Sequence, residues 1–371
     1  IKNDRISALG IFPNYRADET IDGMGAYLAP GFIDIDTDSD HYLTLFNNPS
    51  QSDFLLQGVT TIIGGHCGAS LAPLIYGSLE SIREWTDING INVNWHGVGE
   101  FFKILEKRGL GVNFGTLVGH TTIREAIVGP GRSGPGRSGQ TKRDLSKNEL
   151  KIFNFILAKA LEEGALGMSF GLGYLQARDT SYSELKNLAG AVSKHNGVCA
   201  IHLRDEKENL VASVKEVLKL SEDTGVDILI NHLRPLEGYE DGFREAMALI
   251  NQKNPENPDR PGPGRSGKIY FDIYPFDESI VLLQSFLPLW AQKEGKESIL
   301  KDIMSRGVRE KIMKELPHLK GERVVIISAP GHEYLIGKSL KNFSRNMNTT
   351  LKRGLLKMME LTKFRASVSC R

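Results

Sequence analysis

The chain has 371 residues, with 46 lysines and arginines against 45 aspartates and glutamates, and its pI is near 7.8. This balance gives no electrostatic basis for binding nucleic acid or an anionic membrane. No apolar run reaches the roughly 18 residues of a membrane-spanning helix, so we expect no membrane partner. Cys67, Cys199 and Cys370 are too scattered for a disulfide framework, which favours a reducing, cytoplasmic location.

Short runs rich in β-forming residues recur along the chain, and each is followed by a stretch that is compatible with a helix. The helical stretches, such as NELKIFNFILAKALEEG and SELKNLAGAVSKHNG, end in glycine, which is typical of a helix C-terminus. Alternation of apolar strands with helices predicts a parallel sheet covered by helices, as a (β/α) barrel or an open doubly wound sheet. The predicted strands lie within residues 27–36, 59–65, 111–120, 165–171, 197–203, 226–233 and 268–275.

An eight-stranded TIM-like (β/α)8 barrel needs one strand more. RVVIIS at 323–328 or ASVSC at 366–370 could supply it, and the second ends one residue before the chain does. We therefore predict an α/β fold built on an incomplete barrel. The unit Pro-Gly-Arg-Ser-Gly recurs in segments 129–140 and 261–267, and its composition excludes helix and strand. Both segments are predicted to be flexible insertions.

Side chains that can bind a metal stand where most of these strands end. In a barrel, the carboxyl ends of the strands form the active site. Asp36 and Asp38 follow the first run, Cys67 follows the second, and His202 and His232 end the fifth and sixth. A cysteine thiolate with two histidines is a catalytic zinc pattern that leaves the fourth position for water. Each residue alone is more often structural, but their joint placement favours a metal site.

The remaining candidates are less specific. His66 and Cys67 are neighbours, so only one of the two side chains should face the site if the strand stays extended. His120, at the end of the third run, fits a substrate contact and a structural role equally well. The other histidines, including His41, follow no strand end and are expected to be structural or exposed.

Several stretches together resemble the amidohydrolase superfamily, and specifically the N-acyl-D-amino-acid deacylases, or D-aminoacylases. The resemblance implies a zinc-bearing (β/α) barrel, here residues 29–371, and a small β-sandwich built from both chain ends, of which residues 1–28 would be a remnant. It also implies hydrolysis of the amide bond in N-acyl-D-amino acids. The matching stretches follow the family order through nearly the whole chain: YLAPGFIDIDTDSD, LLQGVTTIIGGHCGASLAPL, LVGHTTIR, EEGALGMSFGLGY, GVCAIHLRDE, INHLRPLEG, DIYPFDES and GKSL.

The same resemblance implies the metal ligands. Cys67, His202 and His232 match the family residues that hold one tightly bound zinc ion. Asp36 and Asp38 stand where the family has the two histidines of a second, weaker metal position, so we expect them to face the metal cavity. Two added negative charges should weaken the metal as a Lewis acid, and oxygen ligands shift the preference at that position toward Mg²⁺, Mn²⁺ or Ca²⁺.

The resemblance also implies a small-molecule partner, an N-acyl amino acid with a carboxylate. Arg234 matches the basic residue that binds this carboxylate, and Tyr174 and Tyr274 match tyrosines that contact substrate. The catalytic aspartate of the family lies in a G-S-D-G stretch that this sequence lacks, and the sequence does not begin with methionine. We therefore expect a chain truncated at both ends, with impaired activity and no assigned catalytic residue.

Two alternatives stay open. A cyclic amidohydrolase of the dihydroorotase or hydantoinase kind typically has a carboxylated lysine at the end of strand four, where this sequence reads MSFGLGY. A catalytically dead or fragmentary relative would instead act as a metal-stabilised binding protein. The Asp-Thr-Asp sequence and the Pro-Gly-Arg-Ser-Gly insertions favour this second alternative.

Overall fold

The structure is a computed structural model. It describes residues 1–2, 5–14, 16–77, 79–82, 86, 88, 90–128, 143–174, 176–253, 267–292 and 296–370. The predicted insertion at 129–140 and all but the last residue of the one at 261–267 lie outside the described residues.

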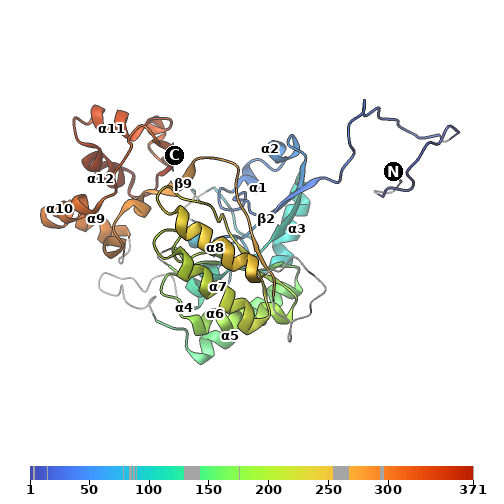
Figure 1. Cartoon of the computed structure of the whole chain (residues 1–371), viewed down its shortest axis with the longest axis horizontal. Helices are drawn as coiled ribbons and strands as arrows, with labels where there is room; N and C mark the ends of the chain where they lie inside the picture. Colours follow the sequence, from blue (N-terminus) through green and yellow to red (C-terminus); the bar gives the residue numbers. More distant parts are fainter. Residues whose placement is uncertain are drawn as a thin grey trace.

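The larger part of the molecule is built on parallel strands covered by helices, and helices α3 to α8 of this part, within residues 98–253, are labelled in Figure 1. The parallel strands are arranged as β1-β2-β3 and as β4-β5-β6-β7-β8, and β3 is separated from β4 by Leu117 alone. Each of the predicted runs contains one of these strands, with β3 and β4 sharing the third run, so the predicted parallel α/β architecture is confirmed. The strands are β1 (Phe32–Asp34), β2 (Val59–Gly64), β3 (Asn113–Thr116), β4 (Val118–Gly119), β5 (Gly167–Gly171), β6 (Val198–His202), β7 (Asp227–Ile230) and β8 (Ile269–Phe271).

Amphipathic helices cover the strands and bury their apolar faces in one core. Leu157, Leu188 and Val214, from three successive helices, are fully buried there with Phe170 and Ile228 of the strands. Such burial stabilises the fold by roughly 1.5–3 kcal/mol for each large apolar side chain. These helices are α1 (Thr44–Asn47), α2 (Ser52–Leu55), α3 (Val98–Arg108), α4 (His120–Val128), α5 (Lys147–Glu162), α6 (Tyr182–Lys194), α7 (Leu210–Thr224) and α8 (Glu240–Lys253).

Local signals place the helix ends. The Ser146 hydroxyl accepts a hydrogen bond from the backbone N–H of Glu149, and the Glu149 carboxylate accepts one from the backbone N–H of Ser146, which is a complete capping box before α5. Gly225 ends α7 in the left-handed region at φ 70°. Of α5, α6 and α7, only α7 has a glycine as its C-cap, whereas the C-cap residues of α5 and α6 are Glu163 and His195, which precede the glycines of the two stretches read from the sequence.

The C-terminal part forms a second sheet with a core of its own. Strands β9 (Ser279–Leu282), β10 (Val324–Ser328) and β11 (Ser367–Cys370) are antiparallel in the order β10-β11-β9. Leu283, Ile326 and Val368 are buried in a hydrophobic cluster separate from that of the parallel strands. The helices of this part are α9 (Lys296–Met304), α10 (Arg306–Glu315), α11 (Leu340–Asn346) and α12 (Leu351–Thr362), and short 3-10 helices occupy Glu80–Ile82, Leu283–Phe286, Leu289–Gln292 and Glu333–Leu335.

The barrel is incomplete, as predicted, but neither candidate eighth strand extends it. RVVIIS and ASVSC pair with each other, Val324 opposite Cys370 and Ile326 opposite Val368, so the expectation that one of them supplies the eighth barrel strand is wrong. Within the described part of the chain, β8 has β7 as its only partner and β1 has β2. The barrel therefore stays open between β8 and β1.

The N-terminal residues extend away from the body of the molecule (Figure 1). In the described part of 1–28, Lys2 and Arg5 form an isolated bridge and every residue is exposed. Assignment of this segment to a β-sandwich, and of 29–371 to the barrel, stays a prediction. None of the described helices combines the length and the apolar character that crossing a membrane requires.

Candidate metal centre

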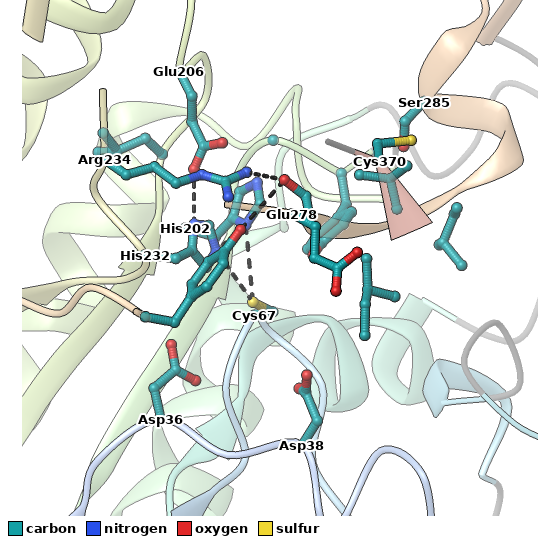
Figure 2. Close-up of a pocket in the computed structure, with 18 of the residues that line it drawn as sticks. Asp36, Asp38, Cys67, His202, Glu206, His232, Arg234, Glu278, Ser285 and Cys370 are labelled. Atoms are coloured by element: carbon teal, nitrogen blue, oxygen red, sulfur yellow. Dashed lines mark hydrogen bonds and ion pairs between the residues drawn. The ribbon is translucent and has the colours of Figure 1, made fainter. Parts of the chain in front are cut away.

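Three side chains from separate strand ends converge on one point. The Cys67 Sγ atom lies 3.8 Å from Nδ1 of His202 and 3.9 Å from Nε2 of His232, and the two nitrogens are 2.8 Å apart. Figure 2 shows the sulfur facing both imidazoles. Among the histidine, cysteine and acidic side chains of the described residues, these three form a group whose ligand atoms lie close enough to share a metal ion. The structure thus brings together the three predicted ligands.

The backbone after β2 aims the cysteine into the site. Cys67 has φ 54°, in the left-handed region, which costs a non-glycine residue on the order of 1–3 kcal/mol. Ser169 of β5 offsets this cost, because its hydroxyl donates to the Gly65 carbonyl at 2.5 Å and accepts from the Gly68 N–H at 3.0 Å. Gly65 itself has φ 80°, and a Cβ there would lie 2.2 Å from the Leu117 carbonyl oxygen. His66 is buried outside the three-ligand group, so only Cys67 of the two neighbours joins it, although β2 ends at Gly64 and the backbone at Cys67 is not extended as the prediction assumed.

The histidines are held from opposite sides. His202 ends β6, and its ring lies against the Tyr174 ring with centroids 4.5 Å apart. His232 follows β7, and its Nδ1 forms an ion pair with Oε1 of Glu206 at 2.9 Å. A carboxylate on one ring nitrogen fixes the proton there and leaves the other nitrogen free to bind a metal. Here that free nitrogen is the Nε2 atom that faces Cys67.

Burial and the neighbouring side chains together set the pKa values of these groups. Burial and the neighbouring His232 lower the pKa of His202 to about 4, so His202 is neutral at pH 7. Against the effect of burial, the contact with His232 lowers the pKa of Glu206 to about 2, so this carboxylate stays ionised. Burial raises the pKa of the Cys67 thiol, and a bound dication would reverse that shift by stabilising the thiolate.

The donor set and its spacing fit zinc. Bonds of about 2.3 Å to sulfur and about 2.0 Å to nitrogen in a tetrahedron place the ligand atoms roughly 3.3–3.6 Å apart. The observed separations of 3.8, 3.9 and 2.8 Å lie within about 0.5 Å of these values. Cys67, His202 and His232 could therefore hold a zinc ion after a small side-chain adjustment, and all three residues line the cavity.

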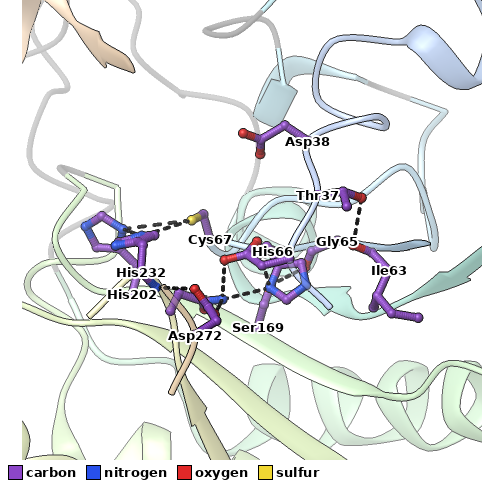
Figure 3. Close-up of polar contacts among 12 residues, drawn as sticks. Thr37, Asp38, Ile63, Gly65, His66, Cys67, Ser169, His202, His232 and Asp272 are labelled. Atoms are coloured by element: carbon purple, nitrogen blue, oxygen red, sulfur yellow. Dashed lines mark hydrogen bonds and ion pairs between the residues drawn. The ribbon is translucent and has the colours of Figure 1, made fainter. Parts of the chain in front are cut away.

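Asp36 and Asp38 line the same cavity, as expected, but other partners hold them. Asp36 accepts a hydrogen bond from Nδ2 of Asn231 at 2.8 Å and lies 3.4 Å from the His66 ring. Asp38 pairs at 3.0 Å with Nδ1 of His41, a fully buried residue. Figure 3 shows Asp38 apart from Cys67 and the two ligand histidines. The structure does not bring either carboxylate into the three-ligand group, so their role as metal ligands stays a prediction.

The predicted substrate residues surround a cavity of about 1760 Å³ that also contains the three-ligand group. Arg234 stacks on Tyr274, with its guanidinium carbon 4.7 Å from the ring centroid, and donates to the Ser279 hydroxyl. Tyr274 donates to the same hydroxyl at 3.3 Å. Tyr174 reaches the cavity beside His202. Arg234, Tyr174 and Tyr274 therefore line one cavity, where Ser279 of β9 joins them from the second sheet, and their role in substrate binding stays a prediction.

His120 is a structural residue. Its ring is fully buried, and Nε2 lies 2.8 Å from Oε1 of Glu184, which also accepts from Arg124 at 3.1 Å. His120 packs against Phe153 of α5 and does not line the cavity. The buried Glu184 carboxylate needs hydrogen-bond donors, and His120 and Arg124 supply them. This structural role accounts for the position of His120 without a substrate contact.

Sequence reasoning gave no role to Glu206, Asn231 or Asp272, which all contact proposed ligands or the residues beside them. Glu206 stands four residues after His202, Asn231 directly precedes His232, and Asp272 directly follows β8. A signal was therefore present, because polar residues at strand ends are the ones that a barrel directs toward its site.

No protein-family model matches the chain. Over 251 residues the chain is 29% identical to a D-aminoacylase of Alcaligenes xylosoxydans xylosoxydans, an alignment that covers 67% of this chain and 49% of the relative. Over 256 residues it is 31% identical to an N-acyl-D-aspartate deacylase of the same organism, covering 68% of this chain and 48% of the relative. The chain thus spans about half the length of these curated relatives.

Solved structures show the same fold. An N-acyl-D-glutamate deacylase of Bordetella bronchiseptica, in complex with zinc and a phosphonate inhibitor, superimposes with a TM-score of 0.68 at 21% identity. A D-aminoacylase structure, described as defining a novel subset of amidohydrolases, superimposes with a TM-score of 0.66 at 22% identity. Each comparison covers 92% of this chain and 60% of the solved chain.

The incomplete parallel barrel, with a cysteine and two histidines at its strand ends, shares its fold with a solved structure described as an amidohydrolase. Three of its curated relatives are a D-aminoacylase, an N-acyl-D-aspartate deacylase and an N-acyl-D-glutamate deacylase. The chain is therefore similar to D-aminoacylases both in sequence and in fold, in agreement with its sequence motifs.

Proposed function

We propose that the protein is a metal-dependent amide hydrolase that cleaves N-acyl-D-amino acids into a carboxylate and a D-amino acid. The observation that carries this proposal is the convergence of Cys67, His202 and His232 on one point at the wall of a large cavity. In the reaction, water adds to the acyl carbon, the carbon–nitrogen bond breaks, and the departing amine takes up a proton.

The proposed cofactor is one tightly held zinc ion. When bound, zinc would polarise the acyl carbonyl and lower the pKa of a water molecule. Glu206 keeps the His232 proton on Nδ1, so that Nε2 offers its lone pair toward the site. Tyr174 covers one side of His202 and limits the motion of its ring. These residues thus preorganise two of the three ligands.

Arg234 is the proposed anchor for the substrate carboxylate. Its partners are neutral: the Ser279 hydroxyl and the face of Tyr274. Within the described residues it forms no salt bridge, and its half-buried guanidinium therefore offers N–H donors to a carboxylate that enters the cavity. A charge-assisted pair of this kind contributes roughly 1.5–3 kcal/mol, so Arg234 would orient the substrate amide toward the three ligands.

Metal content and hydrolysis of the purified chain test the proposal together. We expect about one zinc ion per chain and release of acetate from N-acetyl-D-methionine or N-acetyl-D-glutamate, with the L-isomers much slower. The Cys67→Ala variant should lose the zinc. Cys199→Ala is the matched control, because Cys199 is a buried cysteine of β6 that lies outside the three-ligand group. Zinc retention by Cys67→Ala would contradict the ligand assignment.

The role of Arg234 has a separate test. Arg234→Ala should raise KM for N-acetyl-D-amino acids by roughly 10- to 100-fold through loss of the charge-assisted pair. Arg323→Ala is the control, because Arg323 lines the same cavity but is exposed to solvent. An equal rise of KM in both variants would mean that the cavity attracts the substrate only by its general charge.

The same measurements address the alternatives. Strand β5, which contains the MSFG part of the MSFGLGY stretch, holds no lysine for the carbamate of a cyclic amidohydrolase, so the deacylase is favoured. Zinc binding together with saturable binding of an N-acyl-D-amino acid but no turnover would instead establish a binding protein.

All three cysteines are free, and this supports our proposal of a cytoplasmic location.

A further inference from the structure

The backbone of His232 adopts a conformation that its neighbours must maintain. Its φ is 40°, in the left-handed region that a non-glycine residue rarely occupies. The backbone N–H of His232 donates to Oδ1 of Asp272 at 2.6 Å. Asp272 is itself fixed, because its own N–H donates to the Ile230 carbonyl at 3.1 Å. A short hydrogen bond to a carboxylate thus holds the peptide unit that orients this imidazole.

A buried amide completes the arrangement. The side chain of Asn231 is fully buried, and its Nδ2 lies 3.3 Å from Oδ2 of Asp272. The same nitrogen lies 2.8 Å from Oδ2 of Asp36 and 3.0 Å from Nδ1 of His66. Asn231 therefore links the residue after β8 to the residues after β1 and β2, on both sides of the open seam of the barrel. Figure 3 shows Asp272 and His66 beside each other in this network.

We propose that Asp272 is a positioning residue that holds His232 in its left-handed backbone conformation, and that Asn231 in turn holds Asp272. The proposal rests on the proposed function only in taking His232 as a metal ligand. Without the carboxylate, the His232 peptide unit would relax toward the extended region, and Nε2 would move away from Cys67 Sγ and His202 Nδ1. In this arrangement Asp36 is a partner of the Asn231 amide, and three successive contacts connect Asp36 to His232.

Metal affinity measures this role directly, independently of catalysis. For Asp272→Ala we expect the zinc dissociation constant, measured by competition with a chromophoric chelator, to rise about 10- to 100-fold. In the Co²⁺-loaded chain, the visible absorption bands should shift or lose intensity because the ligand geometry changes. Asp272→Asn retains a carbonyl oxygen for the His232 N–H, so this variant should stay within about fivefold of the wild-type affinity.

Asp227→Ala is the matched control. Asp227 lies at the opposite end of β7, where its carboxylate accepts the backbone N–H of Lys268 at 2.8 Å and joins the same two strands. This variant should keep the wild-type zinc affinity and cobalt spectrum. Equal weakening in the Asp227 and Asp272 variants would overturn the proposal, because it would show a general effect of strand pairing. So would wild-type affinity and an unchanged cobalt spectrum in Asp272→Ala.

Asn231→Ala keeps the test decisive if Asp272→Ala does not fold. This variant retains the bond between Asp272 and His232 and removes the amide that orients Asp272, so several-fold weaker zinc binding is expected. Wild-type affinity in Asn231→Ala would remove Asn231 from the proposal. A wild-type chain that binds no zinc would overturn the metal site and this inference with it, whereas zinc binding without hydrolysis would contradict the proposed reaction alone.

Discussion

Gly173, in the loop after β5, stands where the His202 ring needs space. A Cβ at this position would lie 2.5 Å from Nε2 and 2.7 Å from Cδ2 of His202, and 2.8 Å from the Leu203 carbonyl oxygen. The φ of Gly173 is outside the left-handed region, so the backbone itself tolerates a side chain. Gly173→Ala therefore perturbs the metal ligand by contact alone.

The size of the effect follows from these distances. Ordinary contact begins near 3.4 Å, so the His202 ring would have to retreat by about 0.9 Å. It cannot move freely toward His232, because the two imidazole nitrogens are already 2.8 Å apart. We expect a loss of about 1–3 kcal/mol in the free energy of unfolding from overpacking. We also expect zinc affinity to fall roughly 10- to 100-fold through the displaced ligand.

Thermal unfolding and chelator competition measure the two effects separately. Gly190→Ala is the matched control, because a Cβ on this residue of α6 meets no atom within 4 Å. Alanine in a helix interior should stabilise the protein by roughly 0.5–1 kcal/mol and leave zinc affinity unchanged. Gly173→Ala that binds zinc as tightly as the wild type would refute the reasoning, because His202 would then not be held where its Nδ1 is needed.

Further substitutions probe the charges beside and behind the site. Burial, followed by the charge of Asp38, raises the pKa of Asp36 to about 6, so ionised Asp36 destabilises the metal-free fold above that pH. Asp36→Asn should therefore raise the Tm of the metal-free chain at pH 8, and this gain in Tm should fade as the pH falls from 6 to 4. A gain in Tm that grows as the pH falls would contradict the raised pKa of Asp36. Although burial opposes it, the contact with His41 lowers the pKa of Asp38, so Asp38→Asn should lower the Tm at pH 7 in the same scans. Glu184→Ala leaves His120 and Arg124 without their buried carboxylate and should cost about 3–5 kcal/mol by chemical denaturation. Zinc affinity should stay unchanged in that variant, and its loss would mean that this cluster also supports the metal site.

The strands were predictable because their signals are local. Runs such as Val226–Leu233 combine β-forming apolar residues with a flanking glycine, and the structure places β7 inside that run. The fate of RVVIIS and ASVSC was not predictable in the same way. An apolar run of five or six residues has similar composition in a parallel barrel and in an antiparallel sheet. Its partner is decided by contacts distant in sequence, here Val324 with Cys370.

In the candidate site, too, some features could be predicted from the sequence and others could not. Cys67, His202 and His232 were predictable as a set because a parallel sheet brings its carboxyl ends to one edge. The partners of Asp36 were not, because Asn231 lies 195 residues away in sequence and its amide competes for the carboxylate. His41 was expected to be structural or exposed, and the structure shows it to be structural: it is fully buried and pairs with Asp38.

Those partners change what the two carboxylates do to the metal. Asp40 and Asp38 raise the pKa of His41 to about 10 despite its burial, and its Nε2 donates to the Ala69 carbonyl at 3.2 Å, so His41 is an imidazolium ion. The positive charge of His41 offsets the negative charge of Asp38. Asn231 donates a hydrogen bond to the Asp36 carboxylate. The two added anions therefore do not act on the metal as free charges. The expected weakening of a bound metal as a Lewis acid would be correspondingly smaller, and the proposed preference for zinc would then rest on the sulfur and imidazole donors.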